Sequence, residues 1–153
     1  MGADVGVGTQ ERVCVDASLY VHIMMPDEQS DLADARWEAW LEEGLSIHAP
    51  GLFLWECLNA LRRAVVCERL SEQLAAEARS VLLSAPISLA SMGEKAEEVW
   101  SNFVLVYDLP TVYDAVYLAA AADLGCELWT EDRRLYRTVH EHLPWVRCAS
   151  LEI

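Results

Sequence analysis

The feature that most constrains the fold is a regular alternation of short apolar runs with longer amphipathic stretches. The apolar runs predict strands at Arg12–Val15, Leu45–Ala49, Pro86–Ala90, Cys126–Trp129 and Trp145–Leu151. Helices are expected between them, over Leu19–Met24, Ser30–Glu43, Pro50–Val66, Ser71–Leu83, Ser91–Val106, Tyr113–Leu124 and Asp132–Glu141. Parallel neighbours need crossover connections, and helices provide them. The pattern therefore predicts an α/β fold with a mostly parallel sheet covered on both faces.

Local signals mark where several of these helices begin and end. Gly44 and Gly125 stand just past two predicted helices, and Ser71 is suited to cap another. Ser91 and Glu94 have the spacing of a capping box. In the Pro50–Val66 helix, one buried stripe is expected to contain Leu54, Leu58, Leu61 and Val65.

The length of 153 residues and the 54% of hydrophobic residues indicate one folded domain. We expect residues 1–11 to be a flexible lead-in and residues 12–153 to form the domain. The lead-in lacks the features of a secretory signal, and no apolar run reaches the ~18 residues that span a bilayer. Five isolated cysteines without a C-x-x-C pair predict free thiols. A cytoplasmic protein that does not associate with membranes is expected.

The net charge restricts the function. Twenty-five acidic residues against eleven basic ones give a formal charge of −14. Because affinity for phosphate comes mainly from Lys and Arg, such a surface argues against nucleic-acid binding. That objection weakens if some of the acids bind a metal and the few arginines are well placed.

Three aspartates are predicted at one rim of the sheet. Asp16 follows its strand directly, Asp132 lies two residues beyond another, and Asp114 begins the alanine-rich helix. Ligands of such folds bind in the crevice beyond the carboxyl ends of the strands. Glu56 lies one turn inside a helix, on a polar strip with Asn59 and Arg63 that looks into the same cleft.

Four carboxylates in one crevice repel one another, so at least one must take up a proton unless cations intervene. Mg²⁺ or Mn²⁺ would resolve that conflict, because both prefer carboxylate and water oxygens. Each acid also has a structural interpretation. Asp16 and Asp114 can cap helices, Asp132 can complement a helix dipole with Thr130 as the cap, and Glu56 can be a solvated residue. Those interpretations leave the shared rim unexplained.

The motifs closely resemble those of PIN-domain nucleases. They are V-D-A-S, W-E-C-L-N-A-L, Y-D-A-V-Y-L-A-A-A and L-W-T-E-D-R-R-L, in family order between Val13 and Leu151. Within that family the chain resembles the toxins of VapBC toxin–antitoxin pairs. The resemblance implies a three-layer α/β/α sandwich, Mg²⁺- or Mn²⁺-dependent cleavage of RNA, a homodimer and a cognate antitoxin.

By position, the resemblance assigns the metal-binding acids to Asp16, Glu56, Asp114 and Asp132, and the family's hydroxyl residue to Thr130. Our hypothesis is that metal-activated water attacks the RNA phosphodiester in line. Relatives often carry a further acid after the last aspartate, where this chain has two arginines and where Glu131 is a possible substitute. The candidates to hold the RNA backbone are Arg62, Arg63, Arg133, Arg134 and Arg137.

Other functional classes fit the sequence less well. A response-regulator receiver domain needs a lysine near the end of its last strand, and Trp145–Ile153 has none. A haloacid-dehalogenase-type phosphatase needs D-x-D after its first strand, where this chain has D-A-S. The main alternative is a catalytically silent PIN fold that serves as a binding or regulatory module, which the acidic surface and the missing fifth acid favour.

Overall fold

The computed structural model describes residues 11–25 and 30–152, and its centre is a sheet of five parallel strands. In chain order the strands are β1 (Arg12–Val15), β2 (Ser46–Pro50), β3 (Ile87–Ala90), β4 (Glu127–Trp129) and β5 (Val146–Arg147). They lie side by side in the order β3-β2-β1-β4-β5, and every pairing is parallel. The prediction of an α/β fold with a mostly parallel sheet is confirmed.

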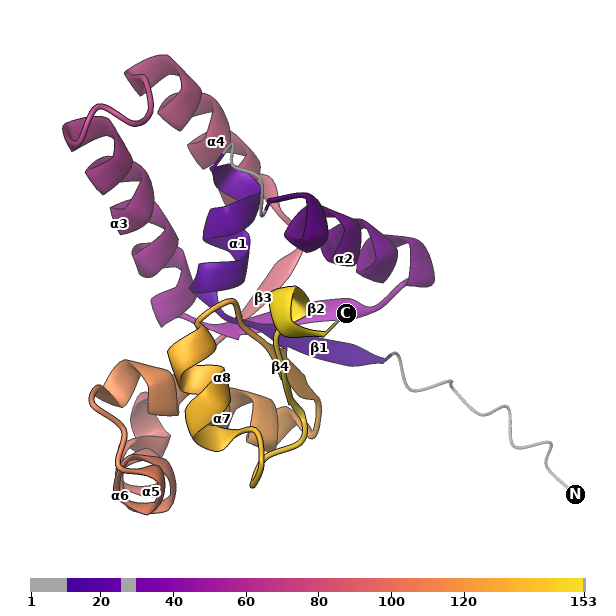
Figure 1. The fold of residues 1–153 in the computed structure, drawn as a ribbon, viewed down its shortest axis with the longest axis vertical. Coiled ribbons are helices and arrows are strands. Elements are labelled where there is room, and N and C mark those ends of the chain that lie inside the picture. The colour runs from indigo at the N-terminus through magenta and orange to yellow at the C-terminus, as the bar shows by residue number, and fades with distance from the viewer. Residues whose placement is uncertain (1–10, 26–29, 153) are drawn as a thin grey trace, which may run out of the picture.

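Helices cover both faces of the sheet (Figure 1). One face carries α1 (Ala17–Met24), α2 (Ser30–Glu43), α3 (Leu52–Val66) and α4 (Glu72–Ser84). On the other lie α5 (Ala96–Val99), α6 (Leu105–Tyr107), α7 (Val112–Leu124) and α8 (Arg133–Val139). The result is a three-layer sandwich from which the α3–α4 hairpin projects.

The strand order places a switch point between β1 and β4. The chain leaves β1 toward β2 and β3 through α1 to α4, and it leaves β4 toward β5 through α8 on the opposite face. The two adjacent strands therefore direct their following segments to opposite sides of the sheet. A crevice opens at such a point, and it is where α/β proteins usually bind ligands.

A large part of the core lies where α7 crosses the sheet. Val13, Cys14 and Val15 of β1 are buried, and α7 contacts β1, β2 and β4. Four alanines of α7 are also buried, and their small side chains let the helix backbone approach the strands closely. Gly125 ends α7 at a φ of +65°, a conformation that glycine adopts without steric cost.

Most predicted boundaries differ from the structure by one or two residues, and two segments differ in kind. The helical stretch after β3 begins at Gly93 with Met92 at its N-cap and no side-chain hydrogen bond, so Ser91 and Glu94 form no capping box. It continues as η1 (Gly93–Lys95), α5, a π-helical η2 (Trp100–Val104) and α6. The last predicted strand shrinks to β5 because β4 offers only three residues as a partner, and the chain then turns into η3 (Ala149–Leu151).

The buried stripe of α3 is also displaced from the predicted one. Its fully buried residues are Phe53, Cys57, Leu61 and Ala64, so only Leu61 was predicted correctly. Leu58 and Val65 instead line a hollow of about 380 Å³ between α3 and α4, where they are half-buried. The apolar side chains of α3 therefore cover a wider arc than one stripe.

The remaining predictions about chain organisation are tested only in part. All five cysteines are free, and Cys14, Cys57 and Cys148 are buried. The predicted lead-in falls almost entirely outside the described residues, which begin at Glu11. No single helix in the described ranges is long and apolar enough to cross a membrane. One pair bent by 110°, Gly93–Tyr107 with Val112–Leu124, passes the same test together.

Candidate metal centre

Asp16 is the most deeply placed carboxylate at the switch point. It follows β1, caps α1 by accepting from the Ser18 amide at 3.4 Å, and is only 7% exposed. Thr130, just past β4, is fully buried and donates its hydroxyl to Asp16 Oδ2 at 2.7 Å. Burial raises the pKa of Asp16 to about 6; the Thr130 hydrogen bond opposes this rise, and the negative charge of Glu56 adds to it.

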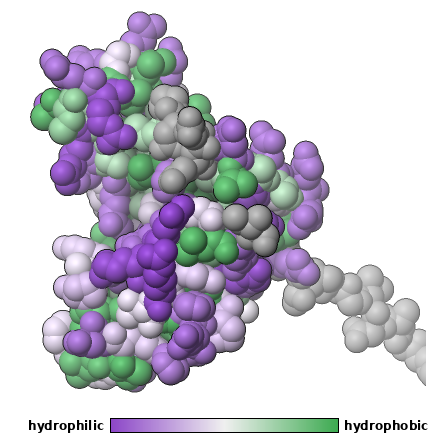
Figure 2. Space-filling view, in the orientation of Figure 1, coloured by the Kyte–Doolittle hydropathy of each residue, from purple (hydrophilic) through white to green (hydrophobic). Residues whose placement is uncertain are grey.

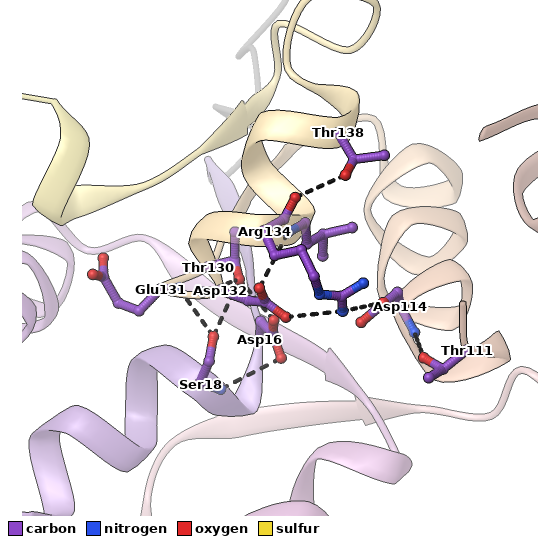
Figure 3. A network of polar contacts seen from close by, with 10 residues as sticks. Asp16, Ser18, Thr111, Asp114, Thr130, Glu131, Asp132, Arg134 and Thr138 are labelled. Atoms are coloured by element: carbon purple, nitrogen blue, oxygen red, sulfur yellow. Dashed lines mark hydrogen bonds and ion pairs between the residues drawn. The ribbon is translucent and has the colours of Figure 1, made fainter. Parts of the chain in front are cut away.

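Thr130 orients Asp16 and the segment that follows β4. Besides donating to Asp16, its hydroxyl accepts from the Asp132 amide at 3.0 Å and lies 3.1 Å from the Ser18 hydroxyl. Ser18 Oγ in turn accepts from the Glu131 amide at 2.9 Å (Figure 3). Because Thr130 has no exposed surface, its position suits alignment of the acids and not contact with a substrate.

Glu56, on α3, lies near Asp16 and Tyr117. Its Oε1 accepts a hydrogen bond from the Tyr117 hydroxyl of α7 at 2.7 Å. Burial raises the pKa of Glu56, the Tyr117 hydrogen bond opposes that rise, and the charge of Asp114 adds to it. Burial and the neighbouring Asp16 raise the pKa of Tyr117 itself, so the phenol remains a hydrogen-bond donor.

Asp114 and Asp132 share one arginine. Nη2 of Arg134, on α8, lies 3.1 Å from Asp114 Oδ2 and 3.5 Å from Asp132 Oδ2 (Figure 3). Asp132 also caps α8 by accepting from the Leu135 amide at 3.1 Å. At the start of α7 the cap is Thr111, whose Oγ1 accepts from the Asp114 amide at 3.4 Å. Burial raises the pKa of Asp114, Arg134 lowers it, and the charge of Asp132 raises it.

The four carboxylates form an electrostatically connected row. The charge of Glu56 acts on Asp16, that of Asp114 on Glu56, and that of Asp132 on Asp114, in each case making ionisation harder. Asp16 and Asp132 cap helices within this row, so both acids also have a structural role. The N-cap of α8 is Asp132 and not Thr130, which corrects the predicted cap.

Hard oxygen donors with unfavourable mutual repulsion fit a divalent cation such as Mg²⁺ or Mn²⁺. In the side-chain positions described, however, no three Asp, Glu, His or Cys side chains of residues 11–25 and 30–152 lie close enough to surround an ion. The donor set therefore fits the metal chemically, and side-chain rotation would be needed to close around it.

The other candidate residues occupy different places. Glu131 points away from the row, because its Oε1 accepts from the Ser150 amide at 3.3 Å. Arg133 contacts the Ser150 hydroxyl at 3.3 Å. Arg62 and Arg63 lie exposed on α3, and Arg137 is exposed on α8. Of the five predicted RNA-binding arginines, only Arg134 makes an ion pair within the described residues.

Sequence reasoning missed two residues of the site. Ser18 stands inside the V-D-A-S motif, two residues after Asp16, a spacing at which its side chain can reach the adjoining loop. Tyr117 lies three residues after Asp114, one helical turn along α7, and therefore shares its face. That i, i+3 spacing was the available signal for Tyr117, but nothing in the sequence identified Glu56 as its partner.

The sequence matches the PIN-domain family over residues 13–141. The chain belongs to this family. A search of curated protein sequences finds no match. The match covers most of the chain and includes all four acids, so the resemblance drawn from the motifs is confirmed. PIN-domain membership also accounts for the strand order and the switch point that gather the acids.

Solved structures support the same fold for this PIN domain. VapC20 of Mycobacterium tuberculosis, described as a sarcin-ricin loop cleaving toxin, aligns with a TM-score of 0.63 at 18% identity, over 83% of this chain and 95% of that chain. PAE2754 of Pyrobaculum aerophilum aligns at 0.64 and 24% identity, over 92% of each. VapBC2 of Rickettsia felis, solved with a promoter DNA fragment, aligns at 0.64 and 10% identity, over 90% and 96%. At these identities the likeness concerns the fold, which is that of VapC proteins.

Proposed function

We propose that this PIN domain is a metal-dependent endoribonuclease and the toxin of a toxin–antitoxin pair. The observation that carries the proposal is the row of four carboxylates, delivered by β1, α3, α7 and the β4–α8 segment to the switch point of a PIN fold. The solved VapC20, which shares the fold, is described as a sarcin-ricin loop cleaving toxin. Both lines support phosphodiester hydrolysis as the reaction.

In this proposal the four acids bind the metal, and two hydroxyl groups hold two of the acids in place. Asp16, Glu56, Asp114 and Asp132 would hold Mg²⁺ or Mn²⁺, which supplies an activated water and neutralises charge on the phosphate. Thr130 holds Asp16 in a fixed orientation, and the Tyr117 hydroxyl does the same for Glu56. Because Asp16 has a raised pKa, it binds metal best well above pH 6, where it is ionised.

The arginines of the α3–α4 hairpin support a path for the RNA. Residues 52–84 contain four acids and four arginines, so this segment is neutral while the whole chain carries −14. Arg62 and Arg63 are exposed on α3, two turns beyond Glu56, and neither pairs with another described residue. Because Arg62 and Arg63 lie exposed without an ion pair in the described residues, phosphates can approach them, and we propose that the RNA backbone follows α3.

Two protein partners belong to the same proposal. A solved complex of similar fold is VapBC2, which supports a cognate antitoxin as a partner.

Exposed apolar side chains support a homodimer: Trp100 is 49% exposed, and Leu105 and Val106 are each 62% exposed. Figure 2 shows apolar surface at the lower end of the molecule, where α5 and α6 lie. Static light scattering of wild type and Leu105→Asp tests the dimer, and an unchanged dimer in Leu105→Asp removes this surface from the interface.

Calorimetric titration of Mn²⁺ into the purified protein tests the metal centre first. We expect saturable binding in wild type and its loss in Asp16→Asn. The matched control is Asp123→Asn at the other end of α7, where the acid pairs with Lys95, and it should bind like wild type. Equal binding in Asp16→Asn would remove Asp16 from the site. Sequencing of the 5′ ends released from total RNA by the Mn²⁺-loaded protein then tests cleavage.

A catalytically silent binding module is the second candidate. The observation in its favour is Arg134, whose guanidinium already lies against two of the four acids, together with the overall charge of −14. Tight Mn²⁺ binding without new 5′ ends in any RNA pool would support the module over the nuclease.

A further inference from the structure

Arg134 is a positive charge built into the carboxylate row. A single nitrogen, Nη2, lies within 3.5 Å of both Asp114 and Asp132, so one guanidinium offsets part of the negative charge of two of the four acids. It thus provides at this end of the row what a metal cation would provide.

The contact between Arg134 and the two aspartates is exposed and uses few of the available donors. The Arg134 side chain is 55% exposed and only one of its nitrogens is engaged with the acids. Asp114 is the more buried partner, with a side chain 15% exposed, and Asp132 is 31% exposed. Arg134 lies in the first turn of α8, two residues after the Asp132 cap, so rotation of its side chain leaves the helix and the cap undisturbed.

We propose that Arg134 is a displaceable internal cation that competes with the divalent metal for Asp114 and Asp132. The inference rests on the proposed metal-dependent function and adds a determinant of affinity. An ion bound by these acids excludes the guanidinium from its present place, because both would bring positive charge to the same oxygens. Metal affinity in this protein is therefore lower than the four acids alone would give, and Arg134 sets the difference.

The test compares Mn²⁺ affinity in wild type, Arg134→Gln and Arg137→Gln by calorimetry. Competition predicts tighter binding in Arg134→Gln, by about 3- to 30-fold, because the ion pairs no longer have to be broken and no guanidinium charge remains beside the bound ion to repel it. Arg137→Gln removes the same charge from the same helix, but Arg137 makes no ion pair in the described residues, so its affinity should change by less than about twofold. Arg134→Lys keeps the charge without the planar fork and should fall between wild type and Arg134→Gln.

The outcomes separate this inference from the proposed function. Weaker or unchanged Mn²⁺ binding in Arg134→Gln, with intact circular dichroism, would show that Arg134 supports the site or is irrelevant to it, while the metal centre would stand. Equal tightening in Arg137→Gln would attribute the effect to net charge and overturn the specific role. Binding seen only in Arg134→Gln would support competition in its strongest form. Absence of binding in both proteins would overturn the metal centre and the competition together.

Discussion

Two arginines in this protein each lie between two carboxylates, and the two arrangements differ in how firmly they are made. On β5, Arg147 donates from Nε and Nη2 to both oxygens of Glu152, at 2.5 and 2.7 Å, and from Nη1 to Glu127 at 2.5 Å. At the switch point, Arg134 offers one nitrogen to Asp114 and Asp132, at 3.1 and 3.5 Å. The first arrangement uses the planar fork of the guanidinium and the second does not.

The surroundings explain the difference. Glu127 and Glu152 meet Arg147 at the edge of the sheet, where its guanidinium also lies 5.2 Å from the Trp129 ring centroid. Asp114 and Asp132 instead belong to the row of four acids. Burial raises the pKa values of the other two members, Glu56 and Asp16. One arginine faces two acids at β5 but four at the switch point, so the excess of negative charge is larger at the switch point. We therefore interpret the first as a structural clamp and the second as a site with unbalanced negative charge.

The rate of RNA cleavage should show the largest difference between variants of the two arrangements. Asp114→Asn and Asp132→Asn are each expected to lower the metal-dependent cleavage rate by at least about 100-fold, because they remove proposed ligands and not outer-shell groups. Glu127→Gln, which breaks one contact of Arg147, should leave the rate within about twofold of wild type. The rates come from single-turnover assays on an RNA shown to be cut. Full activity in either aspartate variant would remove that residue from the site.

Stability against pH should show the unbalanced charge directly. The pKa of Asp16 rises from 3.8 to about 6 on folding, so the folded state binds the proton more tightly than the unfolded state. This contribution to stability is fully present below pH 3.8 and is lost as pH rises through about 6. In the absence of metal, Asp16→Asn should therefore gain stability relative to wild type between pH 4 and pH 7, on the order of 2–3 kcal/mol. Urea unfolding at both values measures it, and a difference independent of pH would contradict the raised pKa.

The location of the acids could be predicted from the sequence because it depends on topology. Alternating strands and helices predict parallel strands, and the carboxyl ends of parallel strands meet at one edge, so Asp16 and Asp132 had to lie together. Helix signals that act within a few residues were also informative, as at Ser71 and Gly125, which cap α4 and end α7. In both cases the cause lies within the local chain or the strand order.

Contacts between distant segments could not be predicted in the same way. The Tyr117 hydroxyl reaches Glu56 across 61 residues of sequence, and Arg134 turns toward Asp114 and not toward solvent. Each depends on how α7 packs beside α3 and α8. The displaced stripe of α3 has the same origin, because its half-buried leucines depend on how closely α4 approaches. Periodicity predicts that a face is apolar, and the neighbouring helix determines which residues become buried.

Substitution of Arg147 should lower thermodynamic stability more than substitution of Arg134. This order is the reverse of the one expected for metal affinity. Arg147→Gln removes three donated hydrogen bonds and is expected to lower stability by roughly 1 kcal/mol, a value that allows for screening of its partly exposed partners. Arg134→Gln should change it by less than about 0.5 kcal/mol, because it breaks two loose contacts and its side chain is 55% exposed. Urea unfolding of the metal-free proteins measures both. A larger loss in Arg134→Gln would identify Arg134 as the structural clamp.

The smallest expected effect concerns the arginines outside both arrangements. Arg62 and Arg63 have no ion pair to give up within the described residues, so a phosphate can engage them without displacing an acid. In an Asp114→Asn background, which is expected to bind RNA without cutting it, Arg62→Gln with Arg63→Gln should reduce the slope of log affinity against log salt by about 0.7 for each phosphate that is no longer neutralised. Fluorescence anisotropy across a salt series measures that slope. Arg147→Gln in the same background removes equal charge per residue from a clamped arginine and should leave the slope unchanged. If the Arg62 and Arg63 double variant keeps the slope of its parent, RNA does not follow α3, and the neutral charge of the hairpin must serve another contact.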